Sequence, residues 1–465
     1  MEFFHPPKPI TIFSSISILL LLIFLLLSQN YNFKFHTPLN STHLHREFPP
    51  ISDQFRALHF PQTAPSRVKL RKVRKTRLSR EEKLELGLAQ ARASIRKAAN
   101  DSNLSTSSID YIPSSSVYHN PRAFYQSYVE MEKRFKVYVY PEGELPITHA
   151  GPCKNIYTIE GRFIHEMEDG GNGFRTVDPS RAHVLFMPFS VAWMVKYLYK
   201  DGSYDQTPLR MFVSDYVEVV SKKYPFWNKT NGADHFILAC HDWGPIATEG
   251  NRFLYNTSIR VLCNANSSEG FNPQKDVSLP EIHLYDGEIS PKLLSASNSH
   301  HHRPHLAFFA GGLHGPIRPI LLNHWKNRTH TNIHVYEYLP KQLDYYDEML
   351  QSRFCLCPSG YEVASPRIVE AIYAECVPVI ISERYVLPFS DVLRWEGFSI
   401  EVSVSEIPRL EEILMGVSEE RYEKLIQGLR TVRKHFVLNR PAKRFDAFHM
   451  ILHSVWLRRL NVKLA

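Results

Sequence analysis

The sequence predicts an α/β protein with two doubly wound domains, preceded by an apolar span and a polar stem. Its 465 residues exceed one ordinary domain. From about residue 124 onward, short apolar runs alternate with helical patterns, and this alternation occurs in two separate series. Strands that alternate with helices indicate mostly parallel sheets covered by helices on both faces. We expect the two domains to face a cleft, with a ligand at the carboxyl ends of the strands.

The first element is an uncharged apolar stretch, Ile10–Leu27. As a helix it is roughly 27 Å long, close to the hydrocarbon thickness of a bilayer. A cleaved signal peptide usually has a shorter apolar core followed by a small-residue cleavage site, and no such site follows here. We therefore expect a cytoplasmic tail (1–9) and a retained transmembrane signal-anchor (10–27).

Charges beside the span give a weak orientation signal, so the glycosylation sequons are the better guide. All of them follow the span, which supports a lumenal body on a type II anchor. They lie at Asn40, Asn100, Asn103, Asn228, Asn256, Asn266 and Asn327.

Residues 28–123 are expected to form a stem, because this segment is polar and has no long apolar run. It contains Arg67–Arg77, with seven basic residues and no acidic one, and without them the formal net charge of +8 falls to about +1. A basic patch outside the folded body argues against a nucleic-acid partner. A capping box at Ser79–Glu82 begins a helix that is either solvated or a dimerising stem, which leaves homo- or hetero-oligomers open.

The first folded domain is predicted over 124–290 and the second over 291–465, which ends in closing helices. Tyr285–Pro304 is a plausible hinge between them. The strands expected in the first domain are 136–141, 182–191 and 234–244, with helices at 156–167 and 208–223. The second domain has expected strands at 305–312, 332–339, 353–360 and 377–382, with helices at 316–325, 344–351 and 366–374.

The six cysteines match no zinc pattern, and no residue is predicted to bind a metal. Some pair if the compartment is oxidising, or most are small buried hydrophobic residues; spacing does not decide between these alternatives. They are Cys153, Cys240, Cys263, Cys355, Cys357 and Cys376.

The most informative stretch is Cys357–Ser382, where a strand runs through Ser359-Gly360 into a helix that begins at Ser365-Pro366. A sugar nucleotide needs acceptors for its hydroxyls and positive potential for its phosphates. Glu362 and Glu370 offer the acceptors. The helix N-terminus and Arg367 offer the positive potential.

A second candidate is Phe308–Arg318, in which a buried strand ends at Gly311-Gly312. These glycines let backbone N–H groups approach a phosphate, and Arg318 can neutralise a leaving diphosphate. The alternative is a tight strand-to-helix turn with a solvated arginine. The glycine spacing is not that of a nicotinamide-binding fingerprint.

A third candidate, Ala239–Pro245, places His241 and Asp242 at the carboxyl end of a strand in the first domain. Inverting sugar transfer needs a base for the acceptor hydroxyl, and either side chain can serve. The alternative is that the pair only binds the acceptor or caps a helix. His149 is a weaker candidate.

These three motifs, in this order, resemble the exostosin family of glycosyltransferases, in particular its plant membrane-bound members. The resemblance covers roughly Phe124 to the C-terminus and implies a GT-B architecture of two Rossmann-like domains, inverting transfer and a type II Golgi membrane anchor. It also implies that Arg318 and Arg367 hold the donor diphosphate and that Glu370, with Glu362, holds donor hydroxyls. One departure is Glu375, where related enzymes often carry glycine.

The expected function is therefore glycosyl transfer from a nucleotide sugar, with a UDP-sugar as the expected donor and a cell-wall polysaccharide or glycoprotein as acceptor. Dependence on a divalent metal stays open, because no D-x-D motif sits at a convincing place. The alternative is a non-catalytic lumenal subunit that binds glycans or scaffolds a complex. The joint presence of Arg318, Arg367 and Glu370 favours the enzyme.

Overall fold

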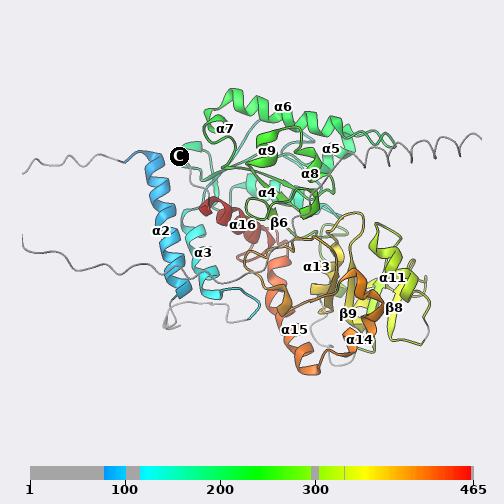
Figure 1. Ribbon diagram of the computed structural model, residues 1–465. Coiled ribbons are helices and arrows are strands. Elements are labelled where there is room, and N and C mark those ends of the chain that lie inside the picture. The colour runs from blue at the N-terminus through cyan, green and yellow to red at the C-terminus, as the bar shows by residue number, and fades with distance from the viewer. Residues whose placement is uncertain (1–77, 101–115, 295–302, 329, 462–465) are drawn as a thin grey trace, which may run out of the picture. The chain divides into compact units, whose positions relative to one another are not determined.

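The computed structural model describes residues 78–100, 116–294, 303–328 and 330–461 (Figure 1). The predicted tail, span and basic run lie outside these ranges, as do residues 295–302 of the predicted hinge. Among the described helices, none is both long and apolar enough to cross a bilayer.

The first sheet has six parallel strands in the order β2-β1-β3-β4-β5-β6. Its central strands are buried on both faces, which explains why they read as continuous apolar runs. The strands are β1 (Val137–Val139), β2 (Arg175–Thr176), β3 (Val184–Phe186), β4 (His235–Ala239), β5 (Ile259–Leu262) and β6 (Val277–Ser278).

Helices connect these strands, as parallel pairing requires. The two longest, α4 and α6, lie within two residues of the ranges expected from the sequence. The helices are α4 (Thr158–Asp169), α5 (Val191–Leu198), α6 (Thr207–Lys223), α7 (Pro225–Thr230), α8 (Gly244–Ala247) and α9 (Arg252–Asn256), with 3-10 turns η1 (Pro179–Arg181) and η2 (Ser267–Glu269).

The second sheet has five parallel strands in the order β11-β10-β9-β7-β8. Two parallel α/β sheets confirm the predicted fold class. The strands are β7 (His305–Ala310), β8 (Ile333–Tyr336), β9 (Ser352–Pro358), β10 (Val377–Ile381) and β11 (Ile400–Glu401).

The helices of this part begin where the sequence places them, within one residue for α11, α12 and α13. Asp344 caps α12 through its side chain, whereas Ser365 occupies the N-cap position of α13 without a side-chain cap. The elements are α10 (Pro291–Leu294), α11 (Ile317–Trp325), α12 (Tyr345–Gln351), α13 (Pro366–Tyr373), η4 (Trp395–Gly397), η5 (Val404–Arg409), α14 (Leu410–Met415), α15 (Glu419–Val432) and η6 (Arg433–Phe436).

The last helix, α16 (Ala447–Asn461), returns to the first sheet and contacts β5 and β6 (Figure 1). Arg458 and Arg459 donate from it to the backbone carbonyls of Asp276 and His183. The predicted second domain includes this helix, which packs against β5 and β6 of the first sheet as well as against α3 (Pro121–Arg134) and η6.

Part of the predicted stem packs on the folded body. The helix predicted from the capping box is α2 (Arg80–Asn100), and it contacts α3 (Pro121–Arg134). Leu88 and Ala91 have no exposed surface, and Arg92 donates to the carbonyl of Leu460 over 2.5 Å. The apolar side of α2 is therefore covered by this same chain, so the structure differs from a helix solvated all round.

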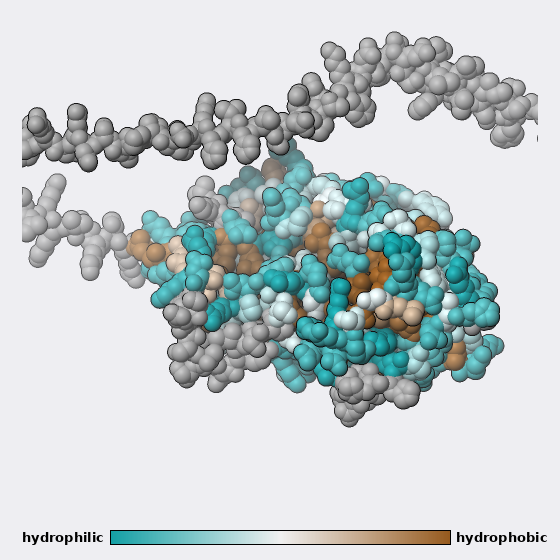
Figure 2. Space-filling model, turned by 60° about the horizontal axis from the view of Figure 1, so that its bottom comes forward, coloured by the Kyte–Doolittle hydropathy of each residue, from teal (hydrophilic) through white to brown (hydrophobic). Residues whose placement is uncertain are grey.

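Two disulfides tie neighbouring segments together: Cys240–Cys263 joins the ends of β4 and β5, and Cys355–Cys376 joins β9 to the start of β10. Cys153 and Cys357 are free thiols. The face of the molecule drawn in Figure 2 is largely hydrophilic between small hydrophobic patches, as expected of a surface that faces water.

Candidate functional site

The strand order of the second sheet places a topological switch point between β7 and β9. In open α/β sheets, ligands bind outside the carboxyl ends of the strands at such a point. Gly311 follows β7 and Ser359 follows β9, so two predicted donor-site motifs meet there. The hydroxyl of Ser359 donates to Ser382 over 2.6 Å, which joins the end of β9 to the end of β10.

Glycines are required at this switch point because two loops and two arginines approach closely. A Cβ atom on Gly315 would lie 1.8 Å from the carbonyl oxygen of Gly360. On Gly311 it would lie 3.0 Å from the guanidinium of Arg367, and on Gly360 it would lie 3.0 Å from that of Arg318. Gly312 has no such backbone neighbour and meets only the His314 ring. Its predicted role therefore has weaker support than that of Gly311.

Arg318 and Arg367 form a cationic pair with unused donors. Arg367 is buried and donates from Nη2 to the Ala310 carbonyl over 2.9 Å, while its Nε and Nη1 have no partner among the described residues. The buried Nε of Arg318 likewise has none there. Burial and the neighbouring Arg367 lower the pKa of Arg318 to about 10. Buried N–H groups without partners are costly, so the pair is suited to an anion.

Glu370 lies beside this pair on α13. Its oxygens lie 3.3 Å and 3.4 Å from the hydroxyls of Tyr345 and Tyr346 on α12, and 3.6 Å from Nδ1 of His283. A carboxylate among hydroxyl and imidazole groups matches the hydrogen-bonding needs of sugar hydroxyls.

Glu281 lies at the centre of the site and is one of the residues that sequence reasoning missed. It is 5% exposed and interacts electrostatically with Asp242, Glu370, Arg318 and Glu362. Burial and the nearby carboxylates raise its pKa well above the usual range. It follows β6, which has only two residues, so no strand pattern drew attention to the buried segment that contains it.

Glu362 faces the first sheet. Burial and then the charges of Glu269 and Asp242 raise the pKa of Glu362 to about 8. A hydrogen bond with Asn264 acts in the opposite direction and lowers it. Its buried Oε2 has no partner in the described part of the chain. The Glu362 side chain therefore lies near the predicted base, and only Glu370 has the sugar-binding neighbours expected of the pair.

Asp242 and His241 differ in their fitness as a base. Burial raises the pKa of Asp242, and the Tyr157 hydroxyl donates to Oδ1 over 2.9 Å. Burial lowers the pKa of His241 to about 4, and its Nδ1 accepts the Trp243 backbone N–H over 3.1 Å. The neutral His241 ring therefore carries its proton on Nε2 and has no free acceptor nitrogen. The geometry favours Asp242.

A buried carboxylate, Glu160, holds the backbone that presents Asp242. Its Oε1 accepts the N–H groups of Cys240 and His241 over 2.7 Å and 3.0 Å. Its Oε2 accepts from the Ala192 N–H over 3.0 Å and from the Ser190 hydroxyl. Glu160 thus joins the loop after β4 to the start of α5, and nothing in its sequence neighbourhood marks it.

A cavity of about 780 Å³ opens beside His241 and Tyr157 in the first domain. Trp193 contributes an aromatic surface, and Lys154 and Arg440 contribute positive charge. Its size and mixed polarity suit a small-molecule or oligosaccharide ligand, and it lies on the Asp242 side of the site.

Several residues named from the sequence have structural roles. His149 donates from Nε2 to the Glu142 carbonyl over 3.0 Å, and its Nδ1 pairs with the Glu168 carboxylate over 2.6 Å, so neither ring nitrogen is free to act as the base. Glu375 has φ 52°, which explains why glycine suits the position, but its carboxylate is buried and paired with Arg430 over 2.9 Å. The Glu375 carboxylate is therefore not solvated.

The predicted glycosylation sequons include one buried position and several exposed ones. Asn266 is buried, and its amide donates to Glu269 over 2.8 Å, so a glycan has no room there. Asn100, Asn228, Asn256 and Asn327 are exposed, while Asn40 and Asn103 lie outside the described residues.

Comparison with known proteins decides the family. The model of the exostosin GT47 domain matches residues 131–417, which include all the donor-site and base candidates. The chain belongs to the exostosin GT47 family. It is accordingly a glycosyltransferase, as the motifs predict.

The similarity to curated relatives extends over most of the chain. A probable glycosyltransferase of Arabidopsis thaliana is 63% identical over 83% of this chain and 80% of its own length. A probable glucuronoxylan glucuronosyltransferase of the same plant is 30% identical over 62% of this chain and 67% of its own. Among solved structures, TarM aligns with 50% of this chain and 55% of its own at 9% identity and a TM-score of 0.27, which is too low to carry an argument.

Proposed function

We propose that this exostosin GT47 enzyme transfers a sugar from a nucleoside diphosphate donor to a glycan hydroxyl with inversion, with Asp242 as the base. The donor diphosphate binds Arg318 and Arg367, and Glu370 binds donor hydroxyls. The donor class follows from the family; the assignment of roles is our own.

One observation carries the proposal: Glu281 interacts at once with Asp242 from the first sheet and with Arg318, Glu362 and Glu370 from the second. These residues span 129 positions of the chain from Asp242 to Glu370, counted inclusively. Cations with unused donors on one side and carboxylates with raised pKa on the other give the opposed charges that glycosyl transfer needs.

In the proposed reaction, the acceptor hydroxyl gives its proton to Asp242 and its oxygen attacks the anomeric carbon. The bond from that carbon to the diphosphate oxygen breaks, and the electron pair leaves with the diphosphate. Arg318 and Arg367 neutralise the charge that develops there. A single displacement with the base on the face opposite the diphosphate inverts the anomeric configuration.

The acceptor is assigned to the 780 Å³ cavity beside His241. Trp193 offers a flat apolar face for a sugar ring, and the base lies at one side of the cavity because Tyr157 both lines it and donates to Asp242. A polysaccharide of the cell wall, or a glycoprotein, is the acceptor class we assign, in keeping with relatives named as glucuronoxylan glucuronosyltransferase and β-1,4-xylosyltransferase.

We assign the enzyme to the Golgi membrane as a type II protein with a lumenal catalytic part. The apolar segment Ile10–Leu27, two disulfides and four exposed sequons support this placement. An endoglycosidase that removes N-linked glycans should lower the apparent mass of the cellular protein. An unchanged mass would count against the lumenal placement.

The test of the reaction is release of nucleoside diphosphate by the full chain from a panel of nucleotide sugars that includes UDP-xylose and UDP-glucuronate. We expect one donor to be consumed in preference, faster when oligosaccharide acceptors are added. We also expect Glu370→Gln to raise the KM for that donor, because its hydroxyls lose a charged acceptor. If the wild type releases nucleoside diphosphate from none of the donors and UDP does not stabilise it, the scaffold function would be favoured.

A further inference from the structure

A second cluster of ligand-type side chains lies on the second sheet, apart from the proposed donor site. His305 begins β7, whose other end leads to Gly311, so roughly 20 Å of strand separates the cluster from the switch point. His334 belongs to the neighbouring strand β8, and Glu348 belongs to α12, which contacts β7. The spacings in sequence match no metal motif, and for this reason sequence reasoning assigned no metal ligand.

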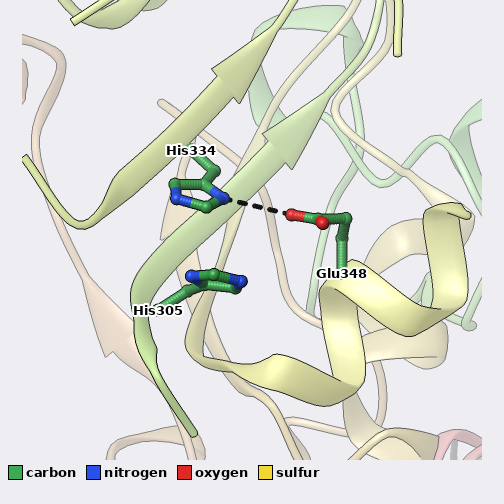
Figure 3. Close-up of side chains that lie close together, drawn as sticks. All are labelled: His305, His334 and Glu348. Carbon is green, nitrogen blue, oxygen red and sulfur yellow. Dashed lines mark hydrogen bonds and ion pairs between the residues drawn. The ribbon is translucent and has the colours of Figure 1, made fainter. Parts of the chain in front are cut away.

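The three side chains converge on one point (Figure 3). Nδ1 of His334 lies 3.1 Å from Oε2 of Glu348, and the rings of His305 and His334 have their centroids 3.9 Å apart. One candidate ligand atom from each residue lies within 4.8 Å of the other two. In the described part of the chain, no other group of three His, Cys, Asp or Glu side chains is gathered in this way.

We propose that His305, His334 and Glu348 bind a divalent transition-metal ion of the Zn²⁺ class. Two imidazoles and a carboxylate are a ligand set that Zn²⁺ uses, with water in the fourth position. Bonds of about 2.0–2.1 Å place tetrahedral ligand atoms roughly 3.4 Å apart. Ligand atoms that lie within 4.8 Å of one another would draw closer to reach that spacing.

A simple ion pair explains less of this geometry. Glu348 and His334 alone would make one, but that pair does not account for the tilted His305 ring, whose centroid lies 3.9 Å from that of His334. Two protonated rings at that distance repel each other, whereas neutral imidazole is the form that binds a metal. Glu348 is 6% exposed and its own carbonyl accepts from the Ser352 hydroxyl over 2.7 Å, so the carboxylate is held on a rigid element.

The ion would connect β7, β8 and α12. The first turn of α12 also carries Tyr345 and Tyr346, whose hydroxyls contact Glu370. The metal site thus stabilises the helix that forms one wall of the proposed donor site, without touching the reacting atoms. Only this consequence depends on the proposed function; binding of the ion does not.

The test uses the full chain, purified without a polyhistidine tag and stripped with a chelator. Co²⁺ is titrated and followed by its visible d–d absorption, and bound Zn²⁺ is counted by equilibrium dialysis. We expect one ion per chain with a tetrahedral nitrogen and oxygen spectrum, and at least tenfold weaker binding in His334→Gln and Glu348→Gln. His330→Gln, at an exposed histidine outside the cluster, should bind as the wild type does.

Thermal unfolding supplies a second readout. Zn²⁺ should raise the midpoint of the wild type and of His330→Gln, but not that of Glu348→Gln. If Glu348→Gln fails to fold, His305→Asn, at a half-buried position, carries the test. Equal affinity in wild type and cluster variants, no saturable binding, or an intense near-ultraviolet thiolate–cobalt band would each overturn the proposal.

Discussion

Replacement of Arg318 by alanine should remove donor binding and leave the folded chain intact. Within the described residues, Arg318 has no hydrogen bond or ion pair, and its buried Nε has no partner. Burial and the like-charged Arg367 lower the pKa of Arg318 to about 10, while Glu281 acts in the opposite direction. The Arg318→Ala variant loses a buried charge and a repulsion together with the attraction to Glu281, so the free energy of unfolding of the unliganded protein should change little.

The magnitude follows from the contact that is lost. A guanidinium–phosphate interaction made of charged hydrogen bonds contributes about 3 kcal/mol, which is roughly 160-fold in the dissociation constant. At a UDP concentration of 100 times the wild-type Kd, UDP stabilises the wild type by about 2.7 kcal/mol. The same concentration stabilises the variant by only about 0.3 kcal/mol. For catalysis, we expect kcat/KM to fall by about 10²–10³.

Thermal unfolding of the full chain by differential scanning calorimetry, with and without UDP, measures the difference in UDP stabilisation between the wild type and Arg318→Ala. The control is Arg409→Ala, because Arg409 is exposed in the same half and pairs only with Glu412 over 2.8 Å among the described residues. A variant Arg318→Ala that keeps the full UDP stabilisation would refute the assignment of the diphosphate site. An unliganded variant that melts well below the wild type would instead show a structural role for Arg318.

Three further results are expected. The kcat/KM of the wild type should fall as the pH drops through the pKa of Asp242, because a base must be ionised, and burial raises this pKa above 3.8. Asp242→Asn should lower kcat by about 10²–10⁴ and abolish the fall of kcat/KM at low pH. Trp193→Ala should raise the acceptor KM by about tenfold, measured with donor KM as control, because stacking contributes about 0.5–1.5 kcal/mol beyond area. Leu88→Ala should lower the free energy of unfolding in urea by about 2–5 kcal/mol, whereas Leu86→Ala, at a residue 48% exposed, should change it by less than about 0.5 kcal/mol.

Much of the second sheet could be predicted from sequence because its signals are local. Asp344 and Pro366 mark helix starts, and the buried runs of β7, β9 and β10 contain no charge within their cores. The predicted donor residues follow these strands directly, so strand order alone brings Gly311 and Ser359 together. Here local pattern and tertiary structure agree.

The first sheet shows where such reasoning stops. β5 was not predicted because Arg260 interrupts its apolar run, yet Arg260 is fully buried and pairs with Asp276 over 2.6 Å. A partner 16 residues away gives no local signal. β6 has two residues and was missed for want of length, and Glu281 was missed with it.

The missed residue changes how the site is understood. Arg318 lowers the pKa of Glu281, while burial and then Asp242 raise it. A donor diphosphate would neutralise Arg318 and so remove an influence that favours the ionised form of Glu281. The pKa of Glu281 would then rise further in the donor complex. Donor binding at Arg318 and the ionisation of Glu281 would thus be coupled.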